Sequence, residues 1–323
     1  MSEESGRRHA PEEQDGRNAP TEQNGRNERD AAPLSPYQCS VHLHTTFCDG
    51  KGTPAEMAAA AYRAGVRYLG FSGHSHTPLA ADAGYVMDRD TSEYRRAVLD
   101  LRREYAGRME VLLGIEWDLY GDSGPAPWED SRGSGMENGE KSGGGWDYWI
   151  GSVHHIMVNG TDCPIDNSPE LFALARDSVF GGDMYAFAEA YYRAVAETAA
   201  HKPTILGHID LVTKFNEHGE FFDETDGRYR QAALSALGPA DPAATLLEIN
   251  TGAMSRGYRS RPYPAPFLLE AWRRRGGRVI LTADAHSSEA VLYGYDAAAE
   301  AARAAGYTNC AVLTAAGVRD CPL

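Results

Sequence analysis

Short apolar runs alternate with amphipathic segments along most of this chain of 323 residues, and this alternation restricts the folds it can adopt. The apolar runs have the length of strands and cover residues 38–44, 68–72, 110–116, 148–153, 204–206, 245–250, 279–282 and 310–313. Helical periodicity is found over residues 54–64, 92–105, 184–200, 226–237, 266–275 and 289–305. Strands that alternate with helices form parallel sheets, so the pattern predicts an α/β fold, either a β/α barrel or a doubly wound sheet.

Two stretches interrupt this alternation. Residues 1–36 contain one leucine and no Phe, Tyr or Trp, so they cannot bury enough surface to offset their ordering entropy and are predicted to be a disordered tail. Residues 121–145 are rich in Gly, Ser and charged side chains, which predicts a flexible surface insertion. The remaining chain, residues 37–323, is expected to form one domain around that insertion.

Charge and cysteine usage exclude several classes of protein. A formal net charge of −15 argues against an extended nucleic-acid surface. No apolar signal segment opens the chain and no run reaches the length of a membrane span, so neither secretion nor membrane insertion is predicted. The 5 cysteines are scattered and form no CxxC pair, which favours a reducing cytoplasm. Dinucleotide and P-loop motifs are also absent from the sequence.

Metal-competent side chains stand where the predicted strands end. His42 and His44 lie two residues apart on the first strand and therefore point to the same side, and Asp49 follows in the next loop. The later strands lead into the other candidates, which are His74, Glu116, His154, His208, Asp284 and His286. The C-terminal strand ends form the active-site face of a β/α barrel, so these imidazoles and carboxylates are expected to meet at one mouth and bind divalent metal ions.

Single members of this set also have a structural interpretation. A lone histidine after a strand is more often a hydrogen-bonded core residue than a ligand, and Glu116 alone could be an ion-paired carboxylate. His155 follows His154 on an extended strand, so it must point the other way and is predicted to be structural. His76 stands in the loop after the second strand, where it could face a substrate or support a ligand.

Six ordered motifs together resemble the polymerase-and-histidinol-phosphatase (PHP) family over about residues 37–300. The motifs are HLHTTFCDG at 42–50, SGH at 72–74, GIEWD at 114–118, SVH at 152–154, GHIDL at 207–211 and ADAH at 283–286. Within the family the chain is most similar to the monofunctional histidinol-phosphatases, because it also carries PID at 164–166, LVTKF at 211–215, EINTG at 248–252 and PYP at 262–264.

The resemblance implies a distorted (β/α)7 TIM-like barrel that holds two to three divalent ions, with Zn, Mn and Fe all compatible with the ligand types. Transferred by motif position, one ion would take His42, His44, Glu116 and Asp284. A second would share Glu116 and add His154 and His208. A third would take Asp49, His74 and His286. The insertion at 121–145 departs from the compact family pattern close to the third motif.

The implied activity is hydrolysis of a small phosphomonoester, with L-histidinol phosphate of histidine biosynthesis as the expected substrate. His76 and Asp210 are the candidate catalytic acids, and the candidate phosphate-binding cations are Lys214, Arg256, Arg259 and Arg261. The alternatives are another PHP phosphoesterase, acting on nucleotides or other small phosphomonoesters, and a non-catalytic metal-binding regulatory module. Neither nucleic acid nor membrane is expected as a partner, and no sequence feature indicates an oligomeric state.

Overall fold

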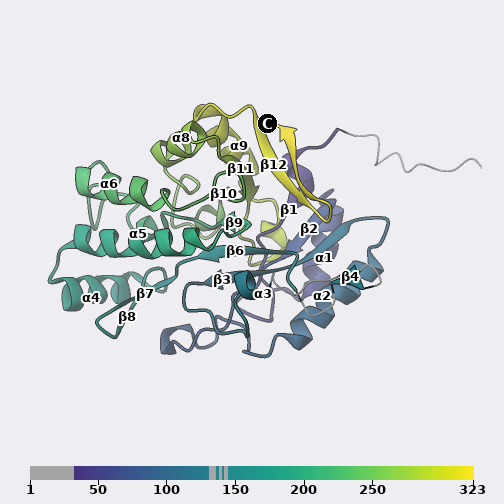
Figure 1. The fold of residues 1–323 in the computed structure, drawn as a ribbon, viewed down its shortest axis with the longest axis horizontal. Helices are drawn as coiled ribbons and strands as arrows, with labels where there is room; N and C mark the ends of the chain where they lie inside the picture. The colour runs from purple at the N-terminus through teal and green to yellow at the C-terminus, as the bar shows by residue number, and fades with distance from the viewer. Residues whose placement is uncertain (1–32, 131–135, 138–139, 142–144) are drawn as a thin grey trace, which may run out of the picture. The chain divides into compact units, whose positions relative to one another are not determined.

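A nine-stranded sheet lies at the centre of the fold, as Figure 1 shows. In spatial order its strands are β1 (Cys39–Ser40), β2 (Tyr68–Phe71), β3 (Glu110–Asp118), β6 (Tyr148–Ser152), β9 (Ile205–Leu206), β10 (Leu246–Asn250), β11 (Arg278–Thr282), β12 (Asn309–Thr314) and β13 (Gly317–Pro322). Neighbours from β1 to β12 are parallel, and β13 returns antiparallel beside β12. This computed structural model describes residues 33–130, 136–137, 140–141 and 145–323, and residues 34–323 belong to one unit.

The sheet curls until its first strand meets the segment that follows β11. Leu43 forms a parallel bridge with Ala285. The amide of His44 donates to Ala285 O at 2.9 Å, and the amide of Ala285 donates to His42 O at 3.1 Å. The strands from β1 to β11 thus form a closed ring, and β12 and β13 extend it on the outside. This closure confirms the predicted distorted (β/α)7 barrel and excludes the doubly wound alternative.

Helices on the outside of the sheet connect its strands (Figure 1). They are α1 (Pro54–Arg63), α2 (Ser92–Glu104), α4 (Pro169–Phe180), α5 (Met184–Ala200), α6 (Gly227–Ala236), α7 (Gly252–Ser255), α8 (Pro266–Arg274) and α9 (Tyr295–Ala304). Capping residues in the sequence indicate where some of these helices begin. Thr53 and Glu56 form a capping box before α1, and Ser168 caps α4 ahead of a proline at the first helical position. The helix α4 and the short α7 were not expected from the sequence.

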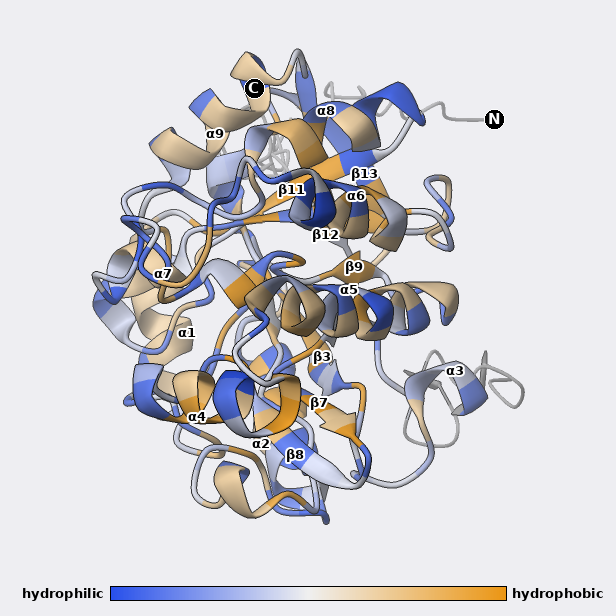
Figure 2. Cartoon of the chain, turned by 90° about the vertical axis from the view of Figure 1, so that its left-hand side faces the viewer, coloured by the Kyte–Doolittle hydropathy of each residue, from blue (hydrophilic) through white to orange (hydrophobic). Residues whose placement is uncertain are grey.

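Apolar side chains of the strands form the core, whereas the helices have one apolar and one polar face (Figure 2). Tyr148 crosses the interior of the barrel and donates its hydroxyl to Val41 O at 2.7 Å. Glycine is needed beside it, because a Cβ on Gly70 or Gly114 would come within 2.3 Å of Tyr148 atoms. These glycines let a large aromatic ring fill the barrel beneath its mouth.

A short antiparallel hairpin, β7 (His155–Val158) and β8 (Thr161–Pro164), follows β6. Its two-residue turn is Asn159-Gly160, with φ of 51° and 78°. Positive φ at both positions is what a type I′ turn requires, so this Asn-Gly pair predicts a hairpin that the alternation of strands and helices does not reveal.

The remaining elements are short. They are η2 (Pro36–Gln38), η3 (Ala80–Asp82), α3 (Pro127–Asp130), β4 (Met136–Glu137), β5 (Glu140–Lys141), η4 (Leu211–Thr213) and η5 (Ser288–Ala290). The predicted tail lies outside the described residues as far as residue 32, and so does much of the predicted insertion at 121–145. Across the described part of the chain, the helices are too short or too polar to cross a bilayer.

Candidate metal centre and phosphate pocket

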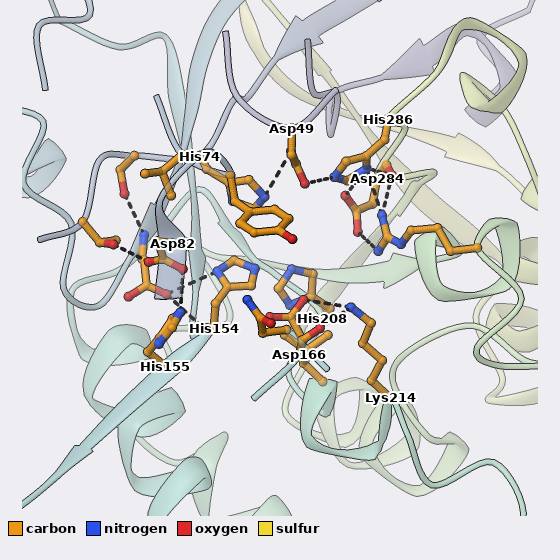
Figure 3. A pocket seen from close by; sticks show the side chains of 18 of the residues that line it. Asp49, His74, Asp82, His154, His155, Asp166, His208, Lys214, Asp284 and His286 are labelled. Carbon is orange, nitrogen blue, oxygen red and sulfur yellow. Dashed lines mark hydrogen bonds and ion pairs between the residues drawn. The ribbon is translucent and has the colours of Figure 1, made fainter. Parts of the chain in front are cut away.

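The strand ends bring the predicted ligands to one pocket with a cavity volume of about 280 Å³ (Figure 3). His74 follows β2, His154 follows β6 and His208 follows β9, so each is delivered by the end of a parallel strand. The remaining pocket-lining members of the predicted set are Asp49, Asp284 and His286. His42, His44 and Glu116 are buried with at most 1% of their surface exposed. The mouth of the barrel thus holds the predicted cluster, as strand polarity requires.

Glu116 is the centre of this cluster, with five of the predicted imidazoles within 3.5 Å of its carboxylate. Its Oε2 lies near one nitrogen each of His42, His44 and His74, at 3.2, 3.4 and 3.0 Å. Its Oε1 lies 2.9 Å from His208 Nε2 and 3.5 Å from His154 Nε2. Two oxygens that face different sets of imidazoles are suited to bridge two ions.

Asp49 gathers a second group on the outer side of the pocket. Its Oδ2 lies 3.0 Å from His286 Nε2, and its Oδ1 lies 3.7 Å from His74 Nε2 (Figure 3). The same Oδ1 lies 3.5 Å from His44 Nδ1. The family resemblance implied that Asp49, His74 and His286 hold one ion together. It assigned His44 to another ion, whereas the structure places His44 beside both groups.

Asp284 faces the first-strand histidines. Its Oδ1 lies 3.2 Å from His44 Nε2 and 3.6 Å from His42 Nε2. The backbone of Asp284 has a φ of 48°, in the left-handed region, where Asp is tolerated better than most residues but remains strained. A Cβ on Gly252 would lie 2.5 Å from Asp284 Oδ2, so a glycine is required beside this carboxylate.

Several buried atoms of the cluster have no hydrogen-bond partner among the described residues. They are His42 Nε2, His44 Nε2, His208 Nδ1, Asp49 Oδ1 and Glu116 Oε2. Burying unpaired polar atoms costs free energy. Four of these five atoms face other predicted ligands at distances of 3.0–3.7 Å. Divalent cations held by these nitrogen and oxygen atoms would satisfy them, so the residues fit the metal ions that the motifs imply. The atoms form overlapping groups that could each hold an ion.

His44 and Glu116 are in the protonation states that metal binding requires. Burial and the neighbouring His286 and His74 lower the pKa of His44 to about 3, so its ring is neutral and keeps a lone pair for an ion. Burial opposes ionisation of Glu116, but the surrounding imidazoles, first His42 and then His74, hold its pKa well below the usual range. Burial opposes protonation of His42 and His74, but neighbouring carboxylates, first Glu248 for His42 and Glu116 for His74, outweigh it and raise the pKa of both rings well above the ordinary value. An ion that binds these two rings would therefore displace their protons.

Two further carboxylates stand behind the histidines. Glu248 Oε1 lies 2.5 Å from His42 Nδ1, and Asp118 Oδ2 lies 3.2 Å from His154 Nδ1. The prediction of ligands did not include Glu248, although an acidic residue inside the apolar strand β10 is itself an indication of a buried polar role. Asp118 extends β3 two residues beyond Glu116 on the same face.

Lys214 and Arg256, two of the predicted phosphate-binding cations, line the pocket. Lys214 Nζ donates to Asp166 O at 2.7 Å and to Asp166 Oδ2 at 3.1 Å (Figure 3). Arg256 Nη2 donates to Asp284 Oδ2 at 3.0 Å. Both cations therefore stand beside the metal cluster, where an anionic group could reach them.

The other two predicted cations, Arg259 and Arg261, are not among the residues that line the pocket. Arg259 is buried, donates to Thr213 O at 2.7 Å and pairs with Glu217 and Glu224. Arg261 also pairs with Glu224, with Nη2 2.5 Å from Oε2. Their charges are satisfied within the protein, which the sequence could not indicate because these partners lie 35 or more residues away.

The predicted catalytic acids, His76 and Asp210, do not line the pocket either. The amide of His76 donates to Ser123 Oγ at 2.7 Å, and Asp210 Oδ2 accepts the amide of Ala265 at 2.7 Å. Burial raises the pKa of Asp210 to about 6. Neither residue is therefore placed where it could reach a substrate bound in this pocket.

The expectation that His155 points away from the pocket is wrong, since it lines the wall beside His154. Its Nε2 lies 2.6 Å from Asp82 Oδ1, and its Nδ1 lies 2.7 Å from Asp162 Oδ1. Burial disfavours the charged ring, but the hydrogen bonds to Asp162 and Asp82 outweigh it and raise the pKa of His155 to about 10. The residues turn into the hairpin at this point, so the alternation of an extended strand no longer applies.

Known proteins carry the same domain. The PHP domain matches residues 40–252 of this chain. A protein of Deinococcus radiodurans named "Probable histidinol-phosphatase" is 33% identical over 253 residues, which are 77% of this chain and 86% of that protein. A protein of Schizosaccharomyces pombe with the same name is 24% identical over 288 residues, covering 85% of this chain and 89% of its own length.

Solved structures support the fold. The histidinol phosphate phosphatase of Lactococcus lactis, crystallised with zinc, L-histidinol and phosphate, superposes with a TM-score of 0.58 at 19% identity. The match covers 88% of this chain and 99% of that protein. The family match spans well over half of the chain, and the six motifs meet at one pocket in the matching fold. This chain therefore belongs to the PHP-domain family.

Proposed function

We propose that this protein is a metal-dependent histidinol-phosphatase, which hydrolyses L-histidinol phosphate to L-histidinol and phosphate. The observation that carries the proposal is the position of Glu116. Its two carboxylate oxygens face five imidazoles, three of them buried and two partly exposed, and unpaired polar atoms lie between them. The names of the relatives from Deinococcus radiodurans and Schizosaccharomyces pombe support the substrate.

Nine residues would hold two to three divalent ions, and Zn, Mn and Fe all suit this mixture of nitrogen and oxygen ligands. The residues are His42, His44, Asp49, His74, Glu116, His154, His208, Asp284 and His286. Zinc in the Lactococcus lactis structure supports this choice of metals. When bound, such ions supply Lewis acidity towards phosphoryl oxygens and lower the pKa of a water molecule.

The protein side chains would bind and orient the phosphate. Arg256 and Lys214 place two positive charges at the pocket, within a protein of net charge −15, so the anion is attracted to this place rather than to the general surface. Arg256 offers a planar guanidinium that matches two phosphate oxygens, and Lys214 offers a compact ammonium group. A cavity of about 280 Å³ is small for a ligand pocket and favours a small phosphomonoester over a nucleotide.

The residues beyond the cations would face the alcohol part of the substrate. Asp82 and His155 lie on the opposite side of His154 from Lys214 and Asp284 (Figure 3). Thr77 and Tyr85 line the same pocket. The free thiols of the described cysteines agree with the proposed cytoplasmic location, where histidine biosynthesis would take place.

Phosphate release from L-histidinol phosphate, compared with a panel of nucleotides and other small phosphomonoesters, tests this function. The expected result is a kcat/KM at least tenfold higher for L-histidinol phosphate, with activity lost on chelation and restored by one of the three metals. Faster turnover of another phosphomonoester would identify a different PHP phosphoesterase. Bound metal without turnover of any of these compounds would identify a regulatory module.

A further inference from the structure

The carboxylate of Glu248 is fully buried at the inner side of the metal cluster and accepts four hydrogen bonds. His42 Nδ1 and Thr282 Oγ1 lie 2.5 and 2.6 Å from its Oε1. The amide of His208 and the side chain of Asn250 donate to its Oε2 at 2.7 and 3.0 Å. All lone-pair directions of this carboxylate are thus directed to donors of the protein.

The contact with His42 determines which nitrogen of that ring carries a proton. An ionised carboxylate can only accept, so the proton of the neutral ring lies on Nδ1 and the lone pair on Nε2. His42 Nε2 faces Glu116 Oε2 at 3.2 Å and Asp284 Oδ1 at 3.6 Å. Glu248 therefore turns the lone pair of His42 towards Glu116 and Asp284, two of the three other predicted ligands of the first ion.

The contact with His208 acts on a second ligand. The amide of His208 is held where the chain leaves β9, and the ring of the same residue reaches Glu116 Oε1 with its Nε2 at 2.9 Å. β9 is the neighbour of β10, whereas β1 is separated from β10 by β11. One side chain on β10 thus connects ligands that come from two different sides of the barrel.

We propose that Glu248 is a positioning residue of the metal centre, which holds His42 in the tautomer that binds an ion and fixes the backbone of His208. The inference rests on the proposed metal-dependent function. Carboxylates that accept the second ring N–H of a metal-binding histidine orient the ring and increase its basicity. Burial of a carboxylate costs free energy, so an apolar side chain would serve better if β10 needed only packing at this position.

The substitution Glu248→Gln tests the proposal with little change of shape. A glutamine can accept a hydrogen bond only through one oxygen, so its NH2 group must face a donor, either at His42 and Thr282 or at His208 and Asn250. We expect a 10- to 100-fold weaker affinity for Zn²⁺, measured by competition with a chromophoric chelator. In the Zn²⁺-loaded protein, where a ligating His42 must be neutral, ¹⁵N NMR of the imidazoles should show its proton on Nδ1 in the wild type and an altered tautomer signal in the variant.

Glu224→Gln is the matched control, because Glu224 also accepts hydrogen bonds from several side chains but does not line the pocket. It should bind Zn²⁺ like the wild type. The rise in melting temperature on adding Zn²⁺ separates the two roles, since a purely structural Glu248 would lower the melting temperatures of metal-free and metal-loaded protein equally. The proposed role predicts a smaller rise in the Glu248→Gln variant.

Wild-type Zn²⁺ affinity together with an unchanged His42 tautomer in Glu248→Gln would overturn the inference. If that variant does not fold, Glu248→Asp keeps the charge on a side chain that is shorter by one methylene group. Wild-type Zn²⁺ affinity in the aspartate variant would overturn the inference in the same way. Failure of the wild-type protein to bind any of the three metals would instead refute the proposed function. The two failures are therefore distinguishable.

Discussion

Arg256 and Asp284 form an ion pair at the edge of the metal cluster, with Nη2 3.0 Å from Oδ2. The other oxygen of Asp284, Oδ1, faces His44 Nε2 at 3.2 Å. One oxygen of this carboxylate therefore contacts a permanent cation, and the other contacts a predicted metal ligand. Arg256 Nη1 also lies 2.9 Å from His286 Nδ1. One guanidinium thus contacts two predicted metal ligands and lines the pocket that would receive the phosphate.

Arg256→Ala should lower kcat/KM for L-histidinol phosphate by roughly 100-fold, because a charged donor at the phosphate is lost and Asp284 loses its partner. Arg256→Lys keeps the charge without the planar fork and should give an intermediate value. Steady-state kinetics with measured metal content checks this prediction. Wild-type kcat/KM in the alanine variant would show that Arg256 does not take part in substrate binding.

Glu116→Gln should lower the metal content of the protein more than the loss of any single imidazole does, since Glu116 faces five imidazoles. The metal content is measured by elemental analysis after gel filtration.

His154→Ala removes one imidazole, so it should lower the metal content by about one ion and abolish nearly all phosphate release while the protein stays folded. Elemental analysis after gel filtration and far-ultraviolet circular dichroism provide the measurements. Full metal occupancy with retained turnover in His154→Ala would refute the role of His154.

Chelation should lower the melting temperature, and added metal should restore it. An ion that binds only the folded state stabilises it by about 2.7 kcal/mol when its free concentration is 100 times the dissociation constant. The melting temperature should therefore rise with the concentration of free Zn²⁺ or Mn²⁺ in a thermal titration. A melting temperature independent of both ions and of Fe²⁺ would contradict the metal centre.

The ion pairs of His155 should stabilise the fold at neutral pH and less so in alkali. Its pKa is about 10 in the folded protein, above the ordinary value of 6.5. The folded state therefore holds a proton that the unfolded state has released, and the stabilisation is complete below pH 6.5 and disappears as the pH rises towards 10.

Urea unfolding of metal-free wild type and His155→Gln checks this dependence. The difference in the free energy of unfolding between the two proteins should be largest near pH 6 and should shrink steadily up to about pH 9.5. Other titrating groups cancel in that difference. A difference that stays constant over this range would show that the ring of His155 is not charged in the folded protein.

Asp210→Asn should leave turnover of L-histidinol phosphate within about twofold, since Asp210 does not line the pocket. Burial raises the pKa of Asp210 from 3.8 to about 6, so its protonated form stabilises the fold below pH 3.8 and this contribution is lost as the pH rises through 6. The neutral asparagine variant should therefore be more stable than the wild type at about pH 8. A decrease in turnover of 100-fold or more would support the role of catalytic acid that was predicted for Asp210.

Local sequence patterns were sufficient to predict where the strands lie along the chain and which candidate ligands stand at or near their ends. The central strands from β2 to β12 begin and end within two residues of the predicted runs, because a buried strand needs a continuous apolar segment. The hairpin β7–β8 and the helix α4 did not follow from that alternation, although the Asn159-Gly160 pair and the cap at Ser168 lie in the sequence.

The sequence by itself determined that histidines and carboxylates follow parallel strands, since strand polarity places all of those ends at one mouth. Only the tertiary structure decided which of these histidines and carboxylates contact one another. The bridge between Leu43 and Ala285 closes the barrel, and this closure brings side chains separated by more than 200 residues, such as His42 and Glu248, into contact. The start of the hairpin at His155 turned that side chain to the pocket, where it pairs with Asp82. Packing paired Arg259 with Glu217 and Glu224, because partners distant in the chain leave no mark in local patterns.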